Sequence, residues 1–316
     1  DCVASYGASI LARQTGGVTQ YCPLVCAATR SVARVLSSLA MRLPRLRTVL
    51  LTPLVLFAAF YVFGVVSLAL RDDAIATLQG PPASFETVAI FGASGTAGDG
   101  ILKAALAAPE ISKIHVVTRR LTPRMEEGVA SGKVQVTMHM DYLDYAAIEE
   151  QVAAVDAVYW AIGISSRGVD EQTYGLIHVD FPRKFVETWR RVSTKPDLSF
   201  HYISSSDISE DSSMMWAREK VRAEKTLFEF ADGTNLRVIA YRPDYIGPTR
   251  EEAHIGQDVL YGFFAPVGAA VRAAQIGQAM IEVTARGAEF RNGDKIGTWN
   301  IRRYSDAYER RVGDAR

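Results

Sequence analysis

The chain has 316 residues, of which 48% are hydrophobic and 9% aromatic, enough for one large α/β domain or two small ones with a packed core. Its formal net charge is zero, so we expect no general polyanion-binding surface and no nucleic-acid partner. The cysteines Cys2, Cys22 and Cys26 all lie near the N-terminus, so neither a disulfide framework nor a cysteine metal site is expected in the rest of the chain.

Residues 1–47 form a basic segment. The sequence contains no Asp or Glu from Cys2 to Leu70, yet it carries six arginines before residue 48. Such a composition is typical of organellar targeting peptides, and a segment of this kind can equally stay disordered. Because the sequence does not begin with Met, residues 1–40 can also be translated upstream sequence, and their presence in the mature protein stays open.

A charge-free run between Arg47 and Arg71 points to a membrane. It comprises 23 residues, 48–70. As a helix such a run would span about 34 Å, at roughly 1.5 Å per residue, which is enough to cross the hydrocarbon core. A cleaved signal peptide beginning at Met41 is the alternative, but the run is longer than an ordinary signal core. We therefore expect a single-pass anchor in an organellar or endomembrane.

A turn-rich linker, residues 71–84, separates this run from a segment in which strand and helix patterns alternate. Alternating short apolar strands and helices predict an α/β domain with a doubly wound parallel sheet, a Rossmann fold, over residues 85–303, followed by a C-terminal tail at 304–316. The predicted strands are 86–91, 113–118, 133–139, 156–162, 198–204 and 236–241. The predicted helices are 98–108, 145–153, 171–192, 213–231 and 268–286.

The stretch after the first predicted strand carries the strongest functional signal. The apolar residues 88–91 are followed by glycines at 92, 95 and 98 and then by a helical pattern. In such a strand–turn–helix, the first glycine allows a tight turn, the second lets a pyrophosphate approach the backbone, and the third lets the helix pack closely on the strand. The spacing is GxxGxxG rather than GxGxxG, so the βαβ context indicates the dinucleotide site. The residues expected to hold the dinucleotide are Gly92, Ser94, Gly95, Thr96, Ala97 and Gly98.

Two arginines at the end of the second predicted strand indicate which dinucleotide is held. An NAD site usually carries an acidic residue there, whereas this chain has Arg119 and Arg120, whose planar donors match a 2′-phosphate and favour NADP over NAD. Asp141, after the third strand, is expected to accept from the adenine amino group. Ala161 and Gly163, after the fourth, are expected to let the backbone lie against the ribose. The alternatives are that the two arginines are solvated surface charges, that Asp141 caps the following helix, and that Ala161 and Gly163 form an ordinary turn.

Several further short motifs follow the glycine turn. With it, the motifs are Gly92-Ala-Ser-Gly-Thr-Ala-Gly98, Ala161-Ile-Gly163, His178-Val-Asp-Phe-Pro182, Ser204-Ser-Ser206, Lys220 with Ala223-Glu224, Arg242-Pro243 and Ile276-Gly-Gln-Ala-Met280. By order and spacing they resemble the atypical short-chain dehydrogenase/reductase superfamily, closest to the NAD(P)-binding branch that includes the Tat-interacting-protein oxidoreductases. The resemblance covers roughly residues 85–303 and implies a Rossmann fold and a nicotinamide cofactor.

One residue departs from that superfamily. Its members use a Tyr four residues before a Lys to handle the proton that accompanies hydride transfer, and a Ser on the preceding strand to polarise the substrate oxygen. The resemblance assigns these roles to Lys220, which would also bind the nicotinamide ribose, and to Ser204 or Ser205. Trp216 stands where the Tyr is expected, and an indole does not ionise in the working range, so it cannot act as a general acid or base.

Residues after the sixth predicted strand complete the expected cofactor site. Pro243 is expected to turn the chain over the nicotinamide pocket, with Tyr245 and Ile246 touching the cofactor. No metal is expected, because the five histidines are scattered without ligand spacing.

Three interpretations of Trp216 stay open. The protein binds NADP without the usual carbonyl reduction, or another group supplies the proton, or the helix register differs. Candidates for the second interpretation are Tyr202, Tyr241, Tyr245 and His201. We therefore expect a membrane-anchored NADP-binding protein that is an oxidoreductase with a degenerate site for an unknown small molecule. The alternative is a catalytically silent scaffold, a sensor or an accessory subunit with partners in a membrane complex.

Overall fold

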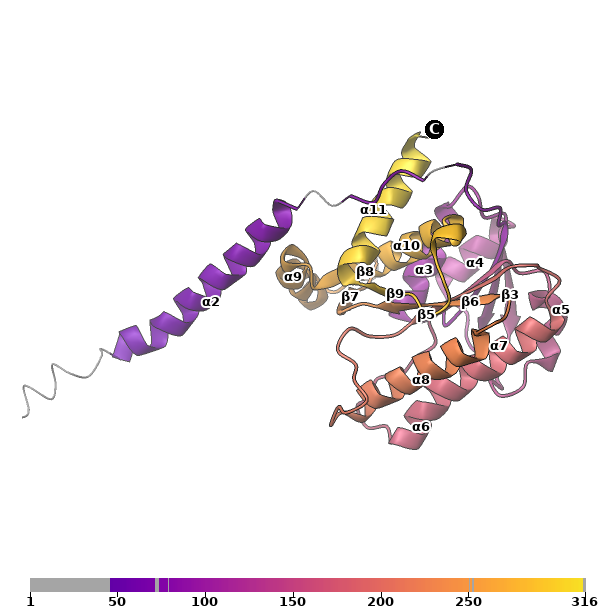
Figure 1. Cartoon of the computed structure of the whole chain (residues 1–316), viewed down its shortest axis with the longest axis horizontal. Coiled ribbons are helices and arrows are strands. Elements are labelled where there is room, and N and C mark those ends of the chain that lie inside the picture. The colour runs from indigo at the N-terminus through magenta and orange to yellow at the C-terminus, as the bar shows by residue number, and fades with distance from the viewer. Residues whose placement is uncertain (1–45, 72–73, 79, 250, 252, 315–316) are drawn as a thin grey trace, which may run out of the picture. The chain divides into compact units, whose positions relative to one another are not determined.

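The computed structural model describes residues 46–71, 74–78, 80–249, 251 and 253–314 (Figure 1). The predictions for residues 1–45, including the three cysteines, lie outside the described residues. Helix α2 (Leu46–Ala69) coincides with the charge-free run and contains Pro53 in its first third. Its apolar part, Leu51–Ala69, is long enough to cross a membrane by length and composition, and none of it is buried. A signal sequence near the N-terminus can pass the same test of length and composition.

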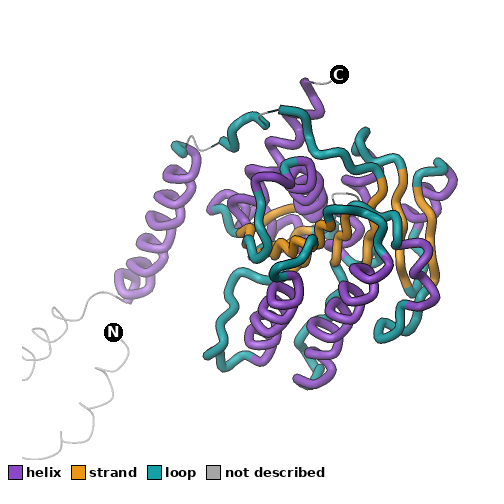
Figure 2. Tube along the Cα trace, turned by 45° about the vertical axis from the view of Figure 1, so that its right-hand side comes forward, coloured by secondary structure: helices purple, strands orange, loops and turns teal. Residues whose placement is uncertain are grey.

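Seven parallel strands form the central sheet, in the order β3-β2-β1-β4-β5-β6-β9 (Figure 2). The strand order reverses between β1 and β4, which is the switch point at which open parallel sheets bind ligands. The predicted doubly wound sheet is thus confirmed. The strands are β1 (Thr87–Phe91), β2 (Lys113–Thr118), β3 (Val134–Met138), β4 (Ala157–Trp160), β5 (Leu198–Ile203), β6 (Leu236–Arg242) and β9 (Lys295–Gly297), and a separate parallel pair is formed by β7 (Tyr245–Gly247) and β8 (Ala270–Arg272).

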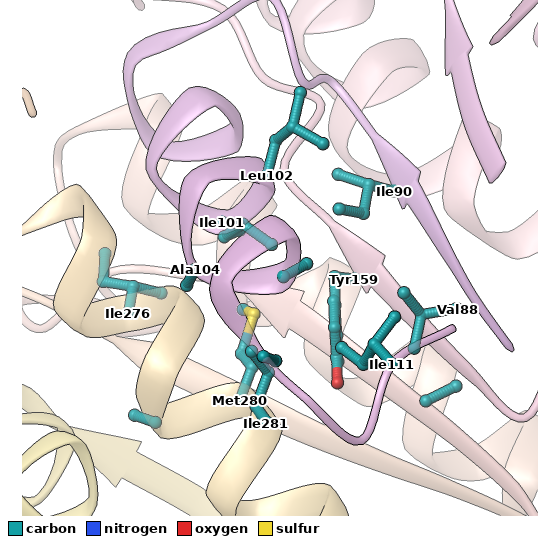
Figure 3. Close-up of a cluster of buried hydrophobic side chains, with 14 of the residues drawn as sticks. Val88, Ile90, Ile101, Leu102, Ala104, Ile111, Tyr159, Ile276, Met280 and Ile281 are labelled. Carbon is teal, nitrogen blue, oxygen red and sulfur yellow. The ribbon is translucent and has the colours of Figure 1, made fainter. Parts of the chain in front are cut away.

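Helices cover both faces of the sheet, and the central strands are mainly apolar because both of their faces are buried. Alternate residues of β1 show this: Val88 and Ile90 belong to one hydrophobic core, Ala89 and Phe91 to the other. Figure 3 shows the first core, which α3 and α10 complete. The helices are α3 (Thr96–Ala107), α4 (Pro123–Ala130), α5 (Glu149–Val152), α6 (Glu171–Gly175), α7 (Phe181–Val192), α8 (Met215–Ala231), α9 (Ile255–Phe264), α10 (Ala273–Ala285) and α11 (Thr298–Asp314).

The six predicted strands are present with ends shifted by at most two residues, whereas some helices differ from the prediction. The helix predicted at 171–192 is divided by a π-helical turn, Leu176–Asp180. The helix predicted at 268–286 begins only at Ala273, because Ala270–Arg272 pairs as a strand. Helices α4, α9 and α11 and strands β7, β8 and β9 were not predicted.

The C-terminal segment is helical and packed. Residue 303, at which the sequence predicts the domain to end, lies inside α11. Tyr308 is buried, and Arg311 lies 2.7 Å from carboxylate oxygens of both Glu282 and Glu110. The segment predicted as a tail is therefore held to the domain by apolar and ionic contacts.

The linker is also docked. Arg286 donates to the carbonyl of Ala76 at 2.8 Å, and Ala83 donates its backbone N–H to Ala285 at 2.8 Å. Arg286 also pairs with Glu282, which is fully buried, at 2.7 Å. Breaking such a buried pair from one side costs about 3–5 kcal/mol, so the pair fixes the point at which the linker meets the domain.

Candidate cofactor site

The glycine turn connects β1 to α3 and admits no side chain at two of its positions. Gly92 has a φ of +78°, and a Cβ there would lie 2.5 Å from the carbonyl carbon of Ala161. A Cβ on Gly98 would lie 2.1 Å from the Gly92 oxygen, so helix α3 rests directly on the turn. A Cβ on Gly95 would meet only the Gly92 oxygen, at 3.5 Å. The turn thus has the tight bend, the close helix packing and the accessible middle glycine that the sequence predicts.

Helix α3 presents a free N-terminus beside this turn. Gly95 is the N-cap residue, and no side chain caps the helix. Thr96, Ala97 and Gly98 form its first turn, where backbone N–H groups have no partner within the helix. An N-terminus of this kind attracts an anion through its N–H donors and the helix dipole.

A cleft of about 620 Å³ lies at the carboxyl ends of β1, β2 and β4. It brings together seven of the residues that the sequence assigns to the dinucleotide: Gly92, Ser94, Gly95, Arg119, Arg120, Ala161 and Gly163. Residues that were not predicted complete its wall, namely Thr118, Met140, Tyr142, Ile162, Ile164, Ile177 and Phe181. The apolar residues that follow a strand could have been proposed from that position. Ile177 and Phe181 do not follow a strand, so their place in the sequence does not indicate that they line the cleft.

The two arginines of the cleft differ in their contacts. The guanidinium of Arg120 donates to the carbonyl of Ser94 at 2.9 Å and so joins β2 to the glycine turn. The guanidinium carbon of Arg119 lies 5.9 Å from the centre of the Tyr142 ring. Both side chains are exposed, and within the described part of the chain neither forms an ion pair. The cleft therefore carries two positive charges that no carboxylate compensates.

Asp141 lies in the turn next to the cleft, outside its lining. Its carboxylate accepts from the backbone N–H of Leu143 at 2.9 Å, while its neighbours Met140 and Tyr142 line the cleft. Asp144 accepts from the N–H of Ala146 at 2.9 Å, just before the 3-10 segment Ala146–Ile148. The adenine contact of Asp141 stays a prediction.

The residues predicted after β6 also lie outside the lining of the cleft. Pro243 is buried and its carbonyl accepts from Ser206 at 3.2 Å. Tyr245 and Ile246 are half-buried in β7, paired with β8. Their contacts with the nicotinamide stay predictions.

Lys220 is enclosed by the protein. Its amine donates to the carbonyl of Ile203 at 2.8 Å and to the hydroxyl of Tyr202 at 3.3 Å. Burial lowers the pKa of Lys220 to about 7, although the nearby carboxylate of Glu224 opposes the shift. With a pKa of about 7 the amine is only partly protonated at physiological pH, and its proton donors are directed at protein oxygens.

The other residues of the predicted catalytic group lie around Lys220. The hydroxyl of Ser204 is buried and has no hydrogen-bond partner, while Ser205 is half-buried. Trp216 is half-exposed in the first turn of α8. None of Ser204, Ser205, Trp216 and Lys220 lines the cleft at the glycine turn.

Three of the four substitute proton donors considered above belong to the core. Tyr202 is fully buried and donates to the carbonyl of His178 at 3.1 Å. Tyr241 and His201 are also buried and lie 2.9 Å apart, joined by a hydrogen bond. Burial raises the pKa of both tyrosines and lowers that of His201 to about 3. These three side chains therefore cannot reach a substrate, and only Tyr245 retains partial exposure.

His178 supports the floor of the cleft. Its Nε2 accepts from the backbone N–H of Ile164 at 3.3 Å, and a Cβ on Gly163 would lie 3.0 Å from its ring. Burial, together with the charge of Lys220, lowers the pKa of His178 to about 2. A neutral imidazole therefore holds the loop after β4 in place.

Solved structures of known proteins share this architecture. A short-chain dehydrogenase/reductase from Serratia marcescens BCRC 10948 matches with a TM-score of 0.54 and 15% identity, over 69% of this chain and 99% of its own. An oxidoreductase of that family from Burkholderia thailandensis matches with a TM-score of 0.53 and 15% identity, over 68% and 92%. A 3-oxoacyl-(acyl-carrier protein) reductase from Brucella melitensis, solved in complex with NAD, matches with a TM-score of 0.53 and 15% identity, over 70% and 98%.

These similarities confirm the predicted fold, which is the Rossmann-type fold of the short-chain dehydrogenases/reductases. No family model and no curated protein sequence matches the chain.

Proposed function

We propose that this domain, which has the fold of the short-chain dehydrogenases/reductases, binds NADP(H) in the cleft at its glycine turn. The observation that carries the proposal is the cleft itself: an open glycine backbone, an uncapped helix N-terminus and two uncompensated arginines lie around one space of about 620 Å³. Each of these features suits a different part of an anionic dinucleotide.

The residues present fit the dinucleotide in three ways. The N–H groups at the start of α3 suit the pyrophosphate, and Gly95 leaves room for it to approach the backbone. Tyr142 and Met140 offer an apolar wall for a base. Arg119, stacked on Tyr142, supplies a charged fork for a phosphate on the adenosine ribose. We infer from this fork that NADP(H) binds more tightly than NAD(H).

The nicotinamide of such a cofactor would supply hydride transfer, and the question is which groups of this chain would manage the accompanying proton. Trp216 cannot release or take up a proton, and the amine of Lys220 already donates hydrogen bonds to Ile203 and Tyr202. We therefore favour a protein that holds the cofactor without the Tyr-dependent proton transfer of the superfamily that the sequence resembles. Such a protein would serve as a scaffold, a sensor or an accessory subunit of a membrane complex.

A second function, an oxidoreductase with an altered proton donor, is favoured by one observation. The hydroxyl of Ser204 is buried without a partner, and a buried hydroxyl of this kind has hydrogen-bonding capacity left for a substrate oxygen. NADPH oxidation by the purified full chain, measured across a panel of carbonyl compounds, separates the two functions. Turnover that is abolished by Ser204→Ala would establish the oxidoreductase.

We also propose that Leu51–Ala69 anchors the protein as a single transmembrane helix. Its length and composition support this, and its side chains are not used in a core. Alkaline carbonate extraction of membranes is the test. Retention of the full chain in the pellet is expected, and release into the supernatant would contradict the anchor.

The cofactor proposal is tested by the affinity of the full chain in detergent for NADPH and NADH. Arg119→Ala should weaken NADPH binding by about 10–100-fold, as loss of a charged hydrogen bond does, and should leave NADH binding nearly unchanged. Arg291→Ala, at an exposed arginine between α10 and β9, is the matched control and should change neither affinity. Equal losses for the two cofactors in Arg119→Ala would refute the 2′-phosphate contact.

A further inference from the structure

Helix α9 presents an apolar face to solvent, while polar side chains and Phe264, which lies against Tyr245, join it to the domain. Ile255 is 86% exposed, Val259 65% and Leu260 47%. Ile255 and Val259 are one turn apart, and Leu260 flanks them, so the three side chains form one outward face. A surface helix of a globular domain normally has the opposite arrangement.

The inward face of α9 is held by polar contacts. Asp258 lies 2.7 Å from the guanidinium of Arg272, and the ring of Tyr261 lies under the same guanidinium, 3.8 Å from its carbon to the ring centre. The Gln257 side chain caps the backbone of His254 at the helix start. These contacts fix the orientation of α9, so its apolar face cannot turn inward without breaking them.

The linker limits how far this part of the domain can lie from the anchor. Ile75, whose carbonyl accepts from Arg310 at 3.3 Å, lies six residue steps after Ala69, at the end of α2. A fully extended chain of that length spans about 20 Å. Helix α11, which carries Arg310, must therefore lie close to the point at which the anchor leaves the bilayer.

Helix α11 connects that docking point to α9. The guanidinium of Arg302, two turns before Arg310, donates to the carbonyl of Ala265 at 2.8 Å, and Ala265 directly follows α9. Eight residues of helix correspond to about 12 Å. The short linker therefore keeps α9 within roughly 30 Å of the end of the anchor, which leaves it able to reach the bilayer surface.

The charge around this region suits an anionic surface. Arg71, Arg302, Arg303 and Arg310 line a cavity of about 200 Å³ together with a single acidic residue, Asp306. Clustered arginines of this kind suit the headgroup region of a bilayer that contains anionic lipids.

We propose that the outward face of α9, formed by Ile255, Val259 and Leu260, inserts into the headgroup region of the bilayer that holds the anchor, with the arginines of α11 facing anionic lipid. This proposal rests on the proposed transmembrane anchor. The contact would give the domain a second point of attachment to the bilayer. The domain would then no longer rotate freely about the linker that joins it to the anchor.

Site-specific fluorescence in vesicles tests the proposal. The full chain, with its three cysteines replaced by serine, receives a single cysteine by Val259→Cys and an environment-sensitive dye. It is reconstituted into vesicles of phosphatidylcholine and phosphatidylserine. The matched control is Val129→Cys, at another exposed valine, on helix α4. Phe60→Cys, inside the apolar part of α2, reports on the anchor.

At position 259 we expect the emission to shift to the blue and its intensity to be quenched when nitroxide-labelled lipid is included. Neither change is expected at position 129. A label at 259 that responds only to a water-soluble quencher, as the label at 129 does, would overturn the proposal. Protection of 259 from both quenchers, with energy transfer between differently labelled chains, would also overturn it, because a second copy would then cover α9. The label at 60 shows whether the anchor is inserted, so failure of the anchor can be told apart from failure of the α9 contact. Whether or not the anchor is inserted, the fluorescence at 259 decides the α9 contact.

Discussion

The cofactor cleft and the surroundings of Lys220 lie at the same edge of one sheet, yet they differ in how much chemistry they expose. The cleft is open, with about 620 Å³ of space and with Arg119 and Arg120 uncompensated by carboxylates. Lys220 and Ser204 are each only 6% exposed. The amine of Lys220 already donates hydrogen bonds to Ile203 and Tyr202. The residues proposed to bind a cofactor are therefore accessible, whereas those expected to act on a substrate are enclosed.

Among the changes that distinguish the two regions, we expect Gly92→Ala to have the largest effect on NADPH binding and stability. Gly92→Ala places a Cβ 2.5 Å from the Ala161 backbone at a φ of +78°. We expect the turn to deform, with loss of measurable NADPH binding and a destabilisation of about 3 kcal/mol or more. Thermal unfolding and isothermal titration of the full chain in detergent measure the two effects.

Gly132→Ala is the matched control for this change. Gly132 has nearly the same φ, +79°, but nothing lies within 4 Å of its missing Cβ. It should lose only about 1–2 kcal/mol for the backbone conformation and retain NADPH binding. Similar losses of binding in both variants would show that the close contact with Ala161 does not matter.

The buried amine of Lys220 predicts a pH dependence of stability. Its pKa is about 7 in the folded protein, against 10.5 without burial. Between these values unfolding takes up a proton, so rising pH favours the folded state by about 1.4 kcal/mol per pH unit, and the penalty for burying the charge is greatest below pH 7. From pH 7.5 to 9 the wild-type chain should gain about 2 kcal/mol relative to Lys220→Met.

Unfolding midpoints of the two proteins, measured across this pH range, check the expectation. Lys113→Met, at an exposed lysine that begins β2, serves as the control and should keep the wild-type pH profile. Parallel profiles for wild type and Lys220→Met would mean that the amine stays charged in the folded state.

The smallest effect is expected at Trp216. Trp216→Tyr restores the Tyr–Lys spacing of the superfamily but changes no residue that lines the cleft. NADPH affinity should therefore change by less than about twofold, a difference below roughly 0.5 kcal/mol. A larger change would show that α8 reaches the bound cofactor and would weaken the separation between the two regions.

The sequence predicts the first of these regions better than the second, for a physical reason. The glycine turn is a local feature: an apolar strand, glycines at fixed intervals and a following helix are all read from adjacent residues. The burial of Lys220 is not local. It depends on β5, whose Ile203 carbonyl and Tyr202 hydroxyl take the hydrogen bonds of the amine. Nothing in the spacing from Trp216 to Lys220 shows that enclosure.

Other parts of the fold were missed for similar reasons. Strands β7, β8 and β9 contain three residues each, too few for a periodic pattern. Helix α4 did carry a start signal, Thr122 followed by Pro123, and the Thr122 hydroxyl accepts from Met125 as a cap. Helix α9 has no broad apolar inward face, because Ile255, Val259 and Leu260 are exposed.

The measurement that tests the central claim most directly is a titration of the wild-type chain with 2′,5′-ADP and with 5′-AMP. These probes differ only by the 2′-phosphate, so the ratio of their dissociation constants isolates the contact proposed for Arg119. Binding of 2′,5′-ADP at least about tenfold tighter, or about 1.4 kcal/mol, is the predicted result. Equal affinity for the two probes, or no binding of either, would contradict an NADP(H) site in this cleft.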